Sequence, residues 1–345
     1  MKYVARKILC PGLIVLLLSL IFVFMASAEP ADTDLDEDLT PVANESITSE
    51  SAIVIDFTTG LVIYELNADE QRVPASMIKA VAVYVIFDAI RDGMVNLDSS
   101  IEISNATSAF SYVSAFSNVP MPPGSVYTLK ELLDIILVRS ASAAIISAGE
   151  GIFGSEDTLV LKMNEKLQQL GITGKVYDSW GGSPNNRISA KGIAELTRAF
   201  INDYPEILEL TSQTSVIFDE EEYRTTNSLI RSYYGADGFK TGFTRPAGWC
   251  FTGTAQRDGR RIITVTMGSE RGFRFPDTVY LLDHGFEHYN FTIANHIRNS
   301  VLLSVKEQNI QKTPLIPLMM YNIYEAEYIN IRDLAVILNE TEKID

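Results

Sequence analysis

The chain has 345 residues, of which 46% are hydrophobic and 21% are charged, so it can bury a core and is not a disordered protein. This length excludes a disulfide-stapled miniprotein and allows either one large domain with appendages or two domains. The formal net charge of −16 argues against a nucleic-acid-binding protein, which needs a basic surface.

Residues 1–28 have the pattern of a secretory signal peptide. A basic start is followed by an apolar run over 13–25 and by a small-x-small cleavage site that ends at Ala28. An uncleaved anchor stays open, because the uncharged stretch 8–28 could almost span a bilayer. We expect cleavage after Ala28, and hence a secreted, extracytoplasmic protein that contacts the membrane only through this segment if it is retained.

The next segment, residues 29–50, is expected to be a solvated spacer. It holds eight acidic and no basic residues, so it has little to bury. Once the signal segment is removed, Cys250 is the only cysteine, and no internal disulfide can form. Its neighbours Trp249 and Phe251 continue an apolar, strand-like run, so we interpret Cys250 as a buried small hydrophobe and not as a nucleophile.

The first expected elements after the spacer are a hairpin and a helix. Two β-rich runs within residues 52–66 flank a turn at 58–60. A helix of about 17 residues is expected between Pro74 and Gly93. The region 94–235 is expected to be mainly helical, and three of its helix starts are marked by the capping residues Thr128 (with Glu131), Ser155 and Ser189.

Strand patterns return over residues 237–268. Two apolar runs, 249–254 and 262–267, are separated by a hairpin turn signal at 257–260, and Asp277 is expected to cap a helix that reaches Gly285. Strands, helices and strands in this order predict an α+β fold. Both chain ends would build one antiparallel sheet, with helices on its faces and a mostly helical insertion between its halves.

Several familiar catalytic patterns are missing from the sequence. The chain has three histidines, His284, His288 and His296, and no Gly-x-Ser-x-Gly elbow beside which a triad would be expected. His284 and His288 have the i, i+4 spacing of a metal pair, but no compact third ligand is evident, so we interpret them as surface residues. There is also no phosphate-binding loop and no Cys/His cluster for zinc. These observations favour a catalyst that uses neither histidine nor a cofactor.

Ser76-Met77-Ile78-Lys79 is an S-x-x-K sequence at the start of the first expected helix. Residues at i and i+3 share a helix face, so the Lys79 amine can reach the Ser76 hydroxyl. The amine must be neutral to take a proton, and desolvation beside a second cation would favour that state. The spacing alone occurs often by chance.

A second motif, Lys240-Thr241-Gly242, strengthens the catalytic interpretation of the S-x-x-K sequence. S-x-x-K followed by K-T-G is the paired signature of serine penicillin-recognising enzymes. The glycine would let the strand edge approach a ligand closely. Lys240 can supply the second cation and hold a substrate carboxylate, to which Thr241 can donate a hydrogen bond.

From about Ser51 to Gly285, the chain resembles the low-molecular-weight penicillin-binding proteins that act as serine D-alanyl-D-alanine carboxypeptidases. Residues 74–79, 137–144 and 237–244 carry the resemblance. It implies a catalytic domain over 51–290 with the β-lactamase/DD-peptidase-like fold and no cofactor or metal. It also implies peptidoglycan stem peptides ending in D-Ala-D-Ala as substrates and β-lactams as covalent inhibitors.

The family has a third motif, S-x-N, which here reads Ser140-Ala141-Ser142. The asparagine of the family helps to hold the substrate backbone and the active-site lysine. Serine is shorter and carries a hydroxyl instead of an amide, so we expect one hydrogen bond to be lost or mediated by water. That loss would slow turnover by about 10- to 100-fold without abolishing acylation. A neighbouring amide, that of Asn164 or Asn227, would be a compensating partner.

The resemblance also implies the roles of the residues. Lys79 takes the proton of Ser76, which attacks the penultimate D-alanine carbonyl, and Ser140 relays a proton to the leaving amine. Backbone N–H groups of Ser76 and Phe243 hold the oxyanion, and water then hydrolyses the acyl-enzyme. The residues expected to bind the substrate are Lys240, Thr241, Gly242, Phe243, Ser142 and Arg274, the last of which matches a family arginine that contacts the terminal carboxylate.

Residues 291–345 match the family poorly and are expected to form a small C-terminal module. Residues 328–335 resemble the opening of a stalk-type module, and the sequence stops where that module would continue. No amphipathic helix like the one that anchors many family members is evident, which predicts a released or wall-associated enzyme.

Three other functions stay open. The first is a catalytically weak penicillin-binding protein that binds peptidoglycan, and Ser142 favours it. The second is a β-lactamase on the same fold, for which no E-x-x-x-N pattern supplies a deacylating carboxylate. The third is an endopeptidase that cuts cross-linked muropeptides. Turnover of a D-Ala-D-Ala peptide separates the first from an active carboxypeptidase.

Overall fold

The computed structural model describes residues 47–289. The expected signal peptide, most of the acidic spacer and the expected C-terminal module lie outside this range. Within it, no helix has the length and apolar character to cross a membrane.

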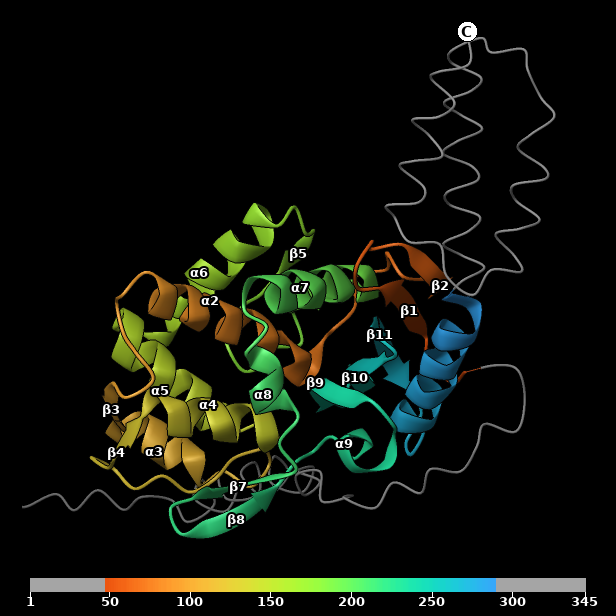
Figure 1. The fold of residues 1–345 in the computed structure, drawn as a ribbon. Helices are drawn as coiled ribbons and strands as arrows, with labels where there is room; N and C mark the ends of the chain where they lie inside the picture. The colour runs from red at the N-terminus through yellow and green to blue at the C-terminus, as the bar shows by residue number, and fades with distance from the viewer. Residues whose placement is uncertain (1–46, 290–345) are drawn as a thin grey trace, which may run out of the picture.

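A five-stranded antiparallel sheet forms the centre of the fold, with the strand order β2-β1-β11-β10-β9. Both ends of the described chain contribute to it, as predicted (Figure 1). The five strands are β1 (Ser51–Asp56), β2 (Val62–Leu66), β9 (Ala236–Thr244), β10 (Gly248–Arg257) and β11 (Arg260–Ser269). The predicted turn between β10 and β11 is confirmed, because Arg257 pairs with Arg260.

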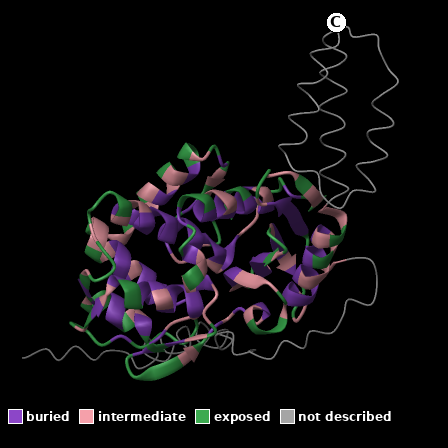
Figure 2. Ribbon diagram, viewed as in Figure 1, coloured by how far each residue is buried: buried purple, intermediate pink, exposed green. Residues whose placement is uncertain are grey.

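Both faces of the sheet are covered, which explains why every residue of β1 is buried. Ile53 and Ile55 point into the larger core, which they share with α2 (Lys79–Arg91) and α7 (Ala190–Asp203). Ala52 and Val54 point the other way, into a smaller core with Leu281 and Leu282 of the helical segment 274–289. The central strands and α2 are correspondingly buried in Figure 2.

A mostly helical region connects the two halves of the sheet, as expected. Besides α2 and α7, which are described above, the helices of this part of the chain are α3 (Asn105–Ser111), α4 (Leu129–Val138), α5 (Ser142–Phe153), α6 (Glu156–Gln169), α8 (Ile207–Thr211) and α9 (Leu229–Ser232). Three short two-stranded sheets that we did not predict lie among them. Their strands are β3 (Ser100–Glu102), β4 (Val126–Thr128), β5 (Gly174–Lys175), β6 (Arg187–Ile188), β7 (Ser215–Phe218) and β8 (Glu221–Arg224).

The three predicted capping residues are confirmed. Thr128 and Glu131 form a full capping box at the start of α4. Ser155 and Ser189 each accept a hydrogen bond from a backbone N–H in the first turn of α6 and α7. Because these contacts span only three residues, the sequence alone was sufficient to place them.

The expected cap at Asp277 is wrong. The last described helix begins at residue 274, so Asp277 lies inside its first turn. Its buried carboxylate instead accepts hydrogen bonds from the backbone N–H groups of Thr48 and Ser49 and from both of their hydroxyls. Thr48 and Ser49 are therefore part of the fold, although we expected them in the solvated spacer.

Candidate active site

Ser76 lies on a single turn of 3-10 helix, η1 (Ala75–Ile78), that leads directly into α2. Together η1 and α2 occupy the stretch where one helix was expected. Lys79 is the first residue of α2 and is fully buried, whereas Ser76 is partly exposed. The Lys79 amine lies 2.9 Å from the Ser76 hydroxyl. The predicted serine and lysine are thus in direct contact.

The Lys79 amine has three further partners from distant parts of the chain. It lies 3.4 Å from the Ser140 hydroxyl, 3.2 Å from the Ser142 hydroxyl and 2.8 Å from the Trp180 carbonyl oxygen. Burial lowers the pKa of Lys79 to about 7, and the nearby Asp178 carboxylate opposes that shift in part. A substantial fraction of the lysine is therefore neutral near pH 7, as a proton acceptor requires.

Ser140 lies between α4 and α5, and Ser142 is the first residue of α5. Ser140 adopts a left-handed backbone conformation with φ of 64°. The backbone N–H of Ser142 donates to the Ser117 carbonyl at 2.8 Å. The Ser140-Ala141-Ser142 motif is therefore fixed from outside by the loop that follows α3.

Lys240 and Thr241 are placed by β9, the edge strand of the sheet beside η1. The buried Lys240 amine donates to the Ser140 hydroxyl at 2.8 Å and to the Thr241 carbonyl at 3.1 Å. Ser140 thus lies between the two lysine amines. Burial and the positive charges of Lys79 and Arg274 hold the pKa of Lys240 well below its usual range.

Gly242 allows β9 to lie directly against the turn that carries Ser76. A Cβ at this position would be 2.8 Å from the Pro74 carbonyl oxygen and 3.2 Å from the Met77 nitrogen, so a side chain would push the two segments apart. Phe243 follows, and its ring packs on that of Trp249 with centroids 4.3 Å apart.

Arg274 begins the last described helix and is buried, with its guanidinium carbon 4.7 Å from the centre of the Trp249 ring. It is close enough to Lys240 for its charge to lower the pKa of that lysine. The predicted carboxylate-binding arginine is therefore in the electrostatic neighbourhood of the K-T-G motif.

Neither of the amides that we considered as substitutes for the missing asparagine forms a hydrogen bond with Lys79. Asn164 bonds the Val160 and Val176 backbone, and Asn227 accepts from the Leu229 N–H. The Ser142 hydroxyl itself supplies the contact with Lys79. The exchange of amide for hydroxyl thus keeps a polar contact to the lysine.

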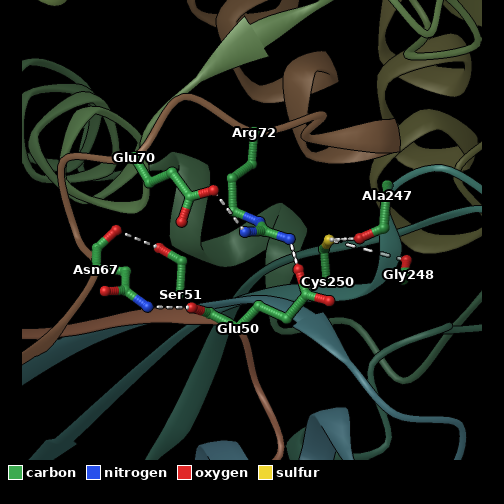
Figure 3. Close-up of polar contacts among 8 residues, drawn as sticks. All are labelled: Glu50, Ser51, Asn67, Glu70, Arg72, Ala247, Gly248 and Cys250. Carbon is green, nitrogen blue, oxygen red and sulfur yellow. Dashed lines mark hydrogen bonds and ion pairs between the residues drawn. The ribbon is translucent and has the colours of Figure 1, made fainter.

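Cys250 is buried, as predicted. Its thiol donates to the Ala247 and Gly248 carbonyl oxygens, and burial raises its pKa to about 11 (Figure 3). The thiolate is therefore scarce near pH 7, which argues against a nucleophilic role. In the same region Arg72 forms ion pairs with Glu50 and Glu70, close to the segment that leads to Ser76.

The histidines within the described range lie away from these residues. The His284 and His288 rings are 4.3 Å apart on the last helix, and His284 also contacts Tyr64. Across residues 47–289, no group of three or more His, Cys, Asp or Glu side chains is placed to hold a metal ion. His296 lies outside the described residues.

Sequence reasoning missed two residues of the site. Trp180 contributes its carbonyl oxygen to Lys79, a role that carries no side-chain signature. Thr226 lies 2.8 Å from Thr241, hydroxyl to hydroxyl, and fixes the orientation of the latter. The adjacent Thr225-Thr226-Asn227 run was the only available signal, and a run of small polar residues is typical of many loops.

Comparison with known proteins relates this geometry to a family. A family profile described as D-alanyl-D-alanine carboxypeptidase matches residues 38–271. The carboxypeptidase DacF of Bacillus subtilis is 30% identical over 266 residues, which cover 75% of this chain and 67% of that protein. DacC of Escherichia coli is 26% identical over 250 residues, which cover 71% of this chain and 62% of that protein. The chain thus spans about two thirds of the length of these relatives.

Solved structures show the same fold. A peptidoglycan synthesis regulatory factor of Streptococcus pneumoniae has 32% identity and a TM-score of 0.66, covering 69% of this chain and 73% of that one. A penicillin-binding protein of Listeria monocytogenes in its ampicillin-bound form has 27% identity and a TM-score of 0.63, covering 70% and 99%. These matches point to the same family as the paired S-x-x-K and K-T-G motifs and the antiparallel sheet. The chain belongs to the D-alanyl-D-alanine carboxypeptidase family and is a serine hydrolase.

Proposed function

We propose that this protein removes the terminal D-alanine from peptidoglycan stem peptides through an acyl-enzyme on Ser76. The main support is the contact between the Ser76 hydroxyl and a fully buried lysine amine whose pKa is lowered to about 7. A neutral amine at 2.9 Å can take the serine proton, and this activates the hydroxyl. The named relatives support the choice of substrate.

Acylation begins when the Ser76 oxygen attacks the carbonyl carbon of the penultimate D-alanine and Lys79 takes the serine proton. The backbone N–H groups of Ser76 and Phe243 are the proposed oxyanion donors. The close approach of β9 to η1 at Gly242 supports this assignment, because it brings the N–H of the next residue beside the serine turn. The C–N bond then breaks, and the amine of the terminal D-alanine needs a proton.

Ser140 is the proposed relay for that proton. Its hydroxyl lies within hydrogen-bond distance of both Lys79 and Lys240, so a proton on Lys79 can reach the leaving amine through it. The carboxylate of the terminal D-alanine would bind at Lys240 and Thr241, with Arg274 adding positive potential. The negative charge of the bound carboxylate would favour the protonated form of Lys240. Water then attacks the ester and releases Ser76.

The direct test is the release of D-alanine from a diacetyl-L-Lys-D-Ala-D-Ala peptide by the purified protein. We expect stoichiometric release of the terminal residue, and full inhibition after the protein has been treated with benzylpenicillin. The penicillin-treated sample is the control, because it is the same folded chain with a blocked serine. Absence of release by a folded, untreated protein would contradict the proposed activity.

The rate of acylation should rise with pH across neutrality. Protonated Lys79 cannot take the serine proton, so the rate is expected to increase about tenfold per pH unit well below its pKa and to level off above about 7. Intact-mass kinetics with benzylpenicillin between pH 5 and 8.5 would measure this profile. A rate that stays constant down to pH 5 would exclude Lys79 as the proton acceptor.

A weakly catalytic, peptidoglycan-binding protein is the second candidate, and the serine at position 142 favours it. Ser142→Asn would supply the family's amide, and we expect it to raise kcat/KM for the D-Ala-D-Ala peptide by about 10-fold. Ser142→Ala is the matched variant, since it removes the contact to Lys79 and should lower the acylation rate. No gain with asparagine would show that this site is adapted to serine.

We also infer that the protein acts outside the cytoplasm after cleavage behind Ala28. The signal pattern and the bacterial relatives, which are named as carboxypeptidases, support this location. The N-terminal residue of the mature protein, measured by mass spectrometry, should be Glu29. If the protein isolated from fractionated cells still carried residues 1–28, cleavage after Ala28 would be contradicted.

A further inference from the structure

Three aromatic rings form a contiguous group on two segments that contact the active site. The Trp180 ring lies 5.2 Å from Phe110 and 4.9 Å from Phe116, centroid to centroid, and the two phenylalanines are 5.5 Å apart. Phe110 and Trp180 are half-buried, whereas Phe116 remains 38% exposed. We call Phe110, Phe116 and Trp180 the aromatic wall.

The aromatic wall is fixed to the active site from two segments. On one side, the Trp180 carbonyl lies 2.8 Å from the Lys79 amine and 3.4 Å from the Ser76 hydroxyl. On the other, the loop after α3 is tied to the Ser140-Ala141-Ser142 motif and to the residue after it. In that loop, the Asn118 side chain accepts from the Ala143 N–H at 2.8 Å and donates to the Phe110 carbonyl at 2.9 Å.

The turn that carries Trp180 is built to hold the indole in place. Asp178 accepts hydrogen bonds from the backbone N–H groups of Gly181 and Ser183, and this closes the turn. A Cβ at Gly182 would lie 1.9 Å from the indole, so only glycine lets the ring fold back against the chain. At Gly181, φ is +91° and a Cβ would be 2.2 Å from the Ala75 carbonyl oxygen.

The site therefore has two chemically different sides. Lys240 and Thr241 provide a cation and a hydroxyl, which suit the carboxylate of the leaving D-alanine. The aromatic wall provides an apolar surface, and it includes the residue whose carbonyl oxygen contacts Ser76 and Lys79. The scissile bond separates the charged leaving group from the acyl part of the substrate, so the acyl part is the one whose surface complements the wall.

We propose that the aromatic wall binds the side chain of the residue that precedes D-Ala-D-Ala, and that it selects donors with a long aliphatic or an aryl group there. This rests on the proposed function, because it concerns the acyl half of the same substrate. Phe116 is the exposed member of the wall, so it is the residue at which the selection can be tested without altering the buried turn.

The test compares two peptides that share D-Ala-D-Ala and differ in the preceding residue. Diacetyl-L-Lys-D-Ala-D-Ala carries a long aliphatic side chain, and acetyl-Gly-D-Ala-D-Ala carries none. We expect the wild type to prefer the lysine peptide in kcat/KM, and Phe116→Ala to reduce that preference about 10-fold, mainly through KM. Phe116→Leu should keep most of it. Tyr234→Ala, which removes a 77% exposed ring on another segment, should leave it unchanged.

A second readout does not depend on peptide turnover. Benzylpenicillin carries an aryl acyl group and 6-aminopenicillanic acid carries none, so the ratio of their acylation rates reports the same preference by intact mass. Phe116→Ala is expected to lower this ratio about 10-fold as well. If the protein releases D-alanine but both ratios in Phe116→Ala match those of the wild type, the proposed role of the aromatic wall is wrong and the proposed carboxypeptidase activity stands.

The remaining outcomes also separate the two proposals. If no peptide is cleaved but the β-lactam ratio falls in Phe116→Ala, the proposed carboxypeptidase activity fails and the role of the wall in binding acyl groups stands. A folded protein that reacts with neither β-lactam nor peptide would overturn both.

Discussion

Ser76→Ala is expected to abolish the penicilloyl adduct that benzylpenicillin forms on the wild-type protein, together with all release of D-alanine. The serine hydroxyl is the only atom of its side chain that can form the ester, and alanine leaves no nucleophile in its place. The 3-10 turn should persist, because its backbone bonds do not use the hydroxyl and the neighbouring Ala75, Met77 and Ile78 are buried. Intact-mass measurement before and after benzylpenicillin reads this result directly.

Ser232→Ala is the matched control for that experiment. Ser232 is exposed at the end of α9, and its hydroxyl donates to the Ser228 carbonyl one turn earlier. It should be labelled at the wild-type rate. A penicilloyl adduct of undiminished yield on Ser76→Ala would mean that another residue is the nucleophile.

Lys79→Met is expected to slow acylation by roughly 10²- to 10⁴-fold, the usual contribution of a positioned general base. Methionine has a similar length and is apolar, so it can occupy the fully buried position without a charge. The Ser76 hydroxyl then has no amine at 2.9 Å to take its proton. The second-order rate of labelling by benzylpenicillin is the measurement.

Lys175→Met is the control, since this lysine is exposed in β5, and it should behave as the wild type. Thermal unfolding of both variants shows whether the fold is retained. Labelling of a folded Lys79→Met at the wild-type rate would assign the base to another group, for which Lys240 is the next candidate through Ser140.

The parts of the site that the sequence predicted are those that short-range chemistry determines. Ser76 and Lys79 share a helical turn, and Lys240 and Thr241 are adjacent on one strand, so each pair is visible in a motif of three or four residues. The antiparallel sheet from both chain ends followed from the order of strand and helix patterns. The capping residues of α4, α6 and α7 were found for the same local reason.

The remaining contacts depend on how distant segments pack. The Trp180 carbonyl reaches Lys79 from 101 positions away, and the backbone oxygen that does so belongs to any residue type. Asp277 followed the pattern of a helix cap, but its partners are Thr48 and Ser49, 229 and 228 positions away. Whether Ser142 could replace an asparagine likewise depended on its distance from Lys79, which no local pattern encodes.

The pairing of β1 with β11 has a consequence for how the chain folds. Ser51 lies opposite Met267, so β1, the first strand within residues 47–289, is synthesised long before β11, the last strand in that range and its partner on that side. The loop that closes between them spans most of the catalytic region, and pairing at such long range is slow. Until β11 is present, the β1–β2 hairpin keeps an open edge that other chains can pair with. A fragment that ends before Arg260 would therefore retain Ser76 and Lys79 but lack β11, the strand that joins β1 to β10, and we expect it to aggregate rather than bind substrate.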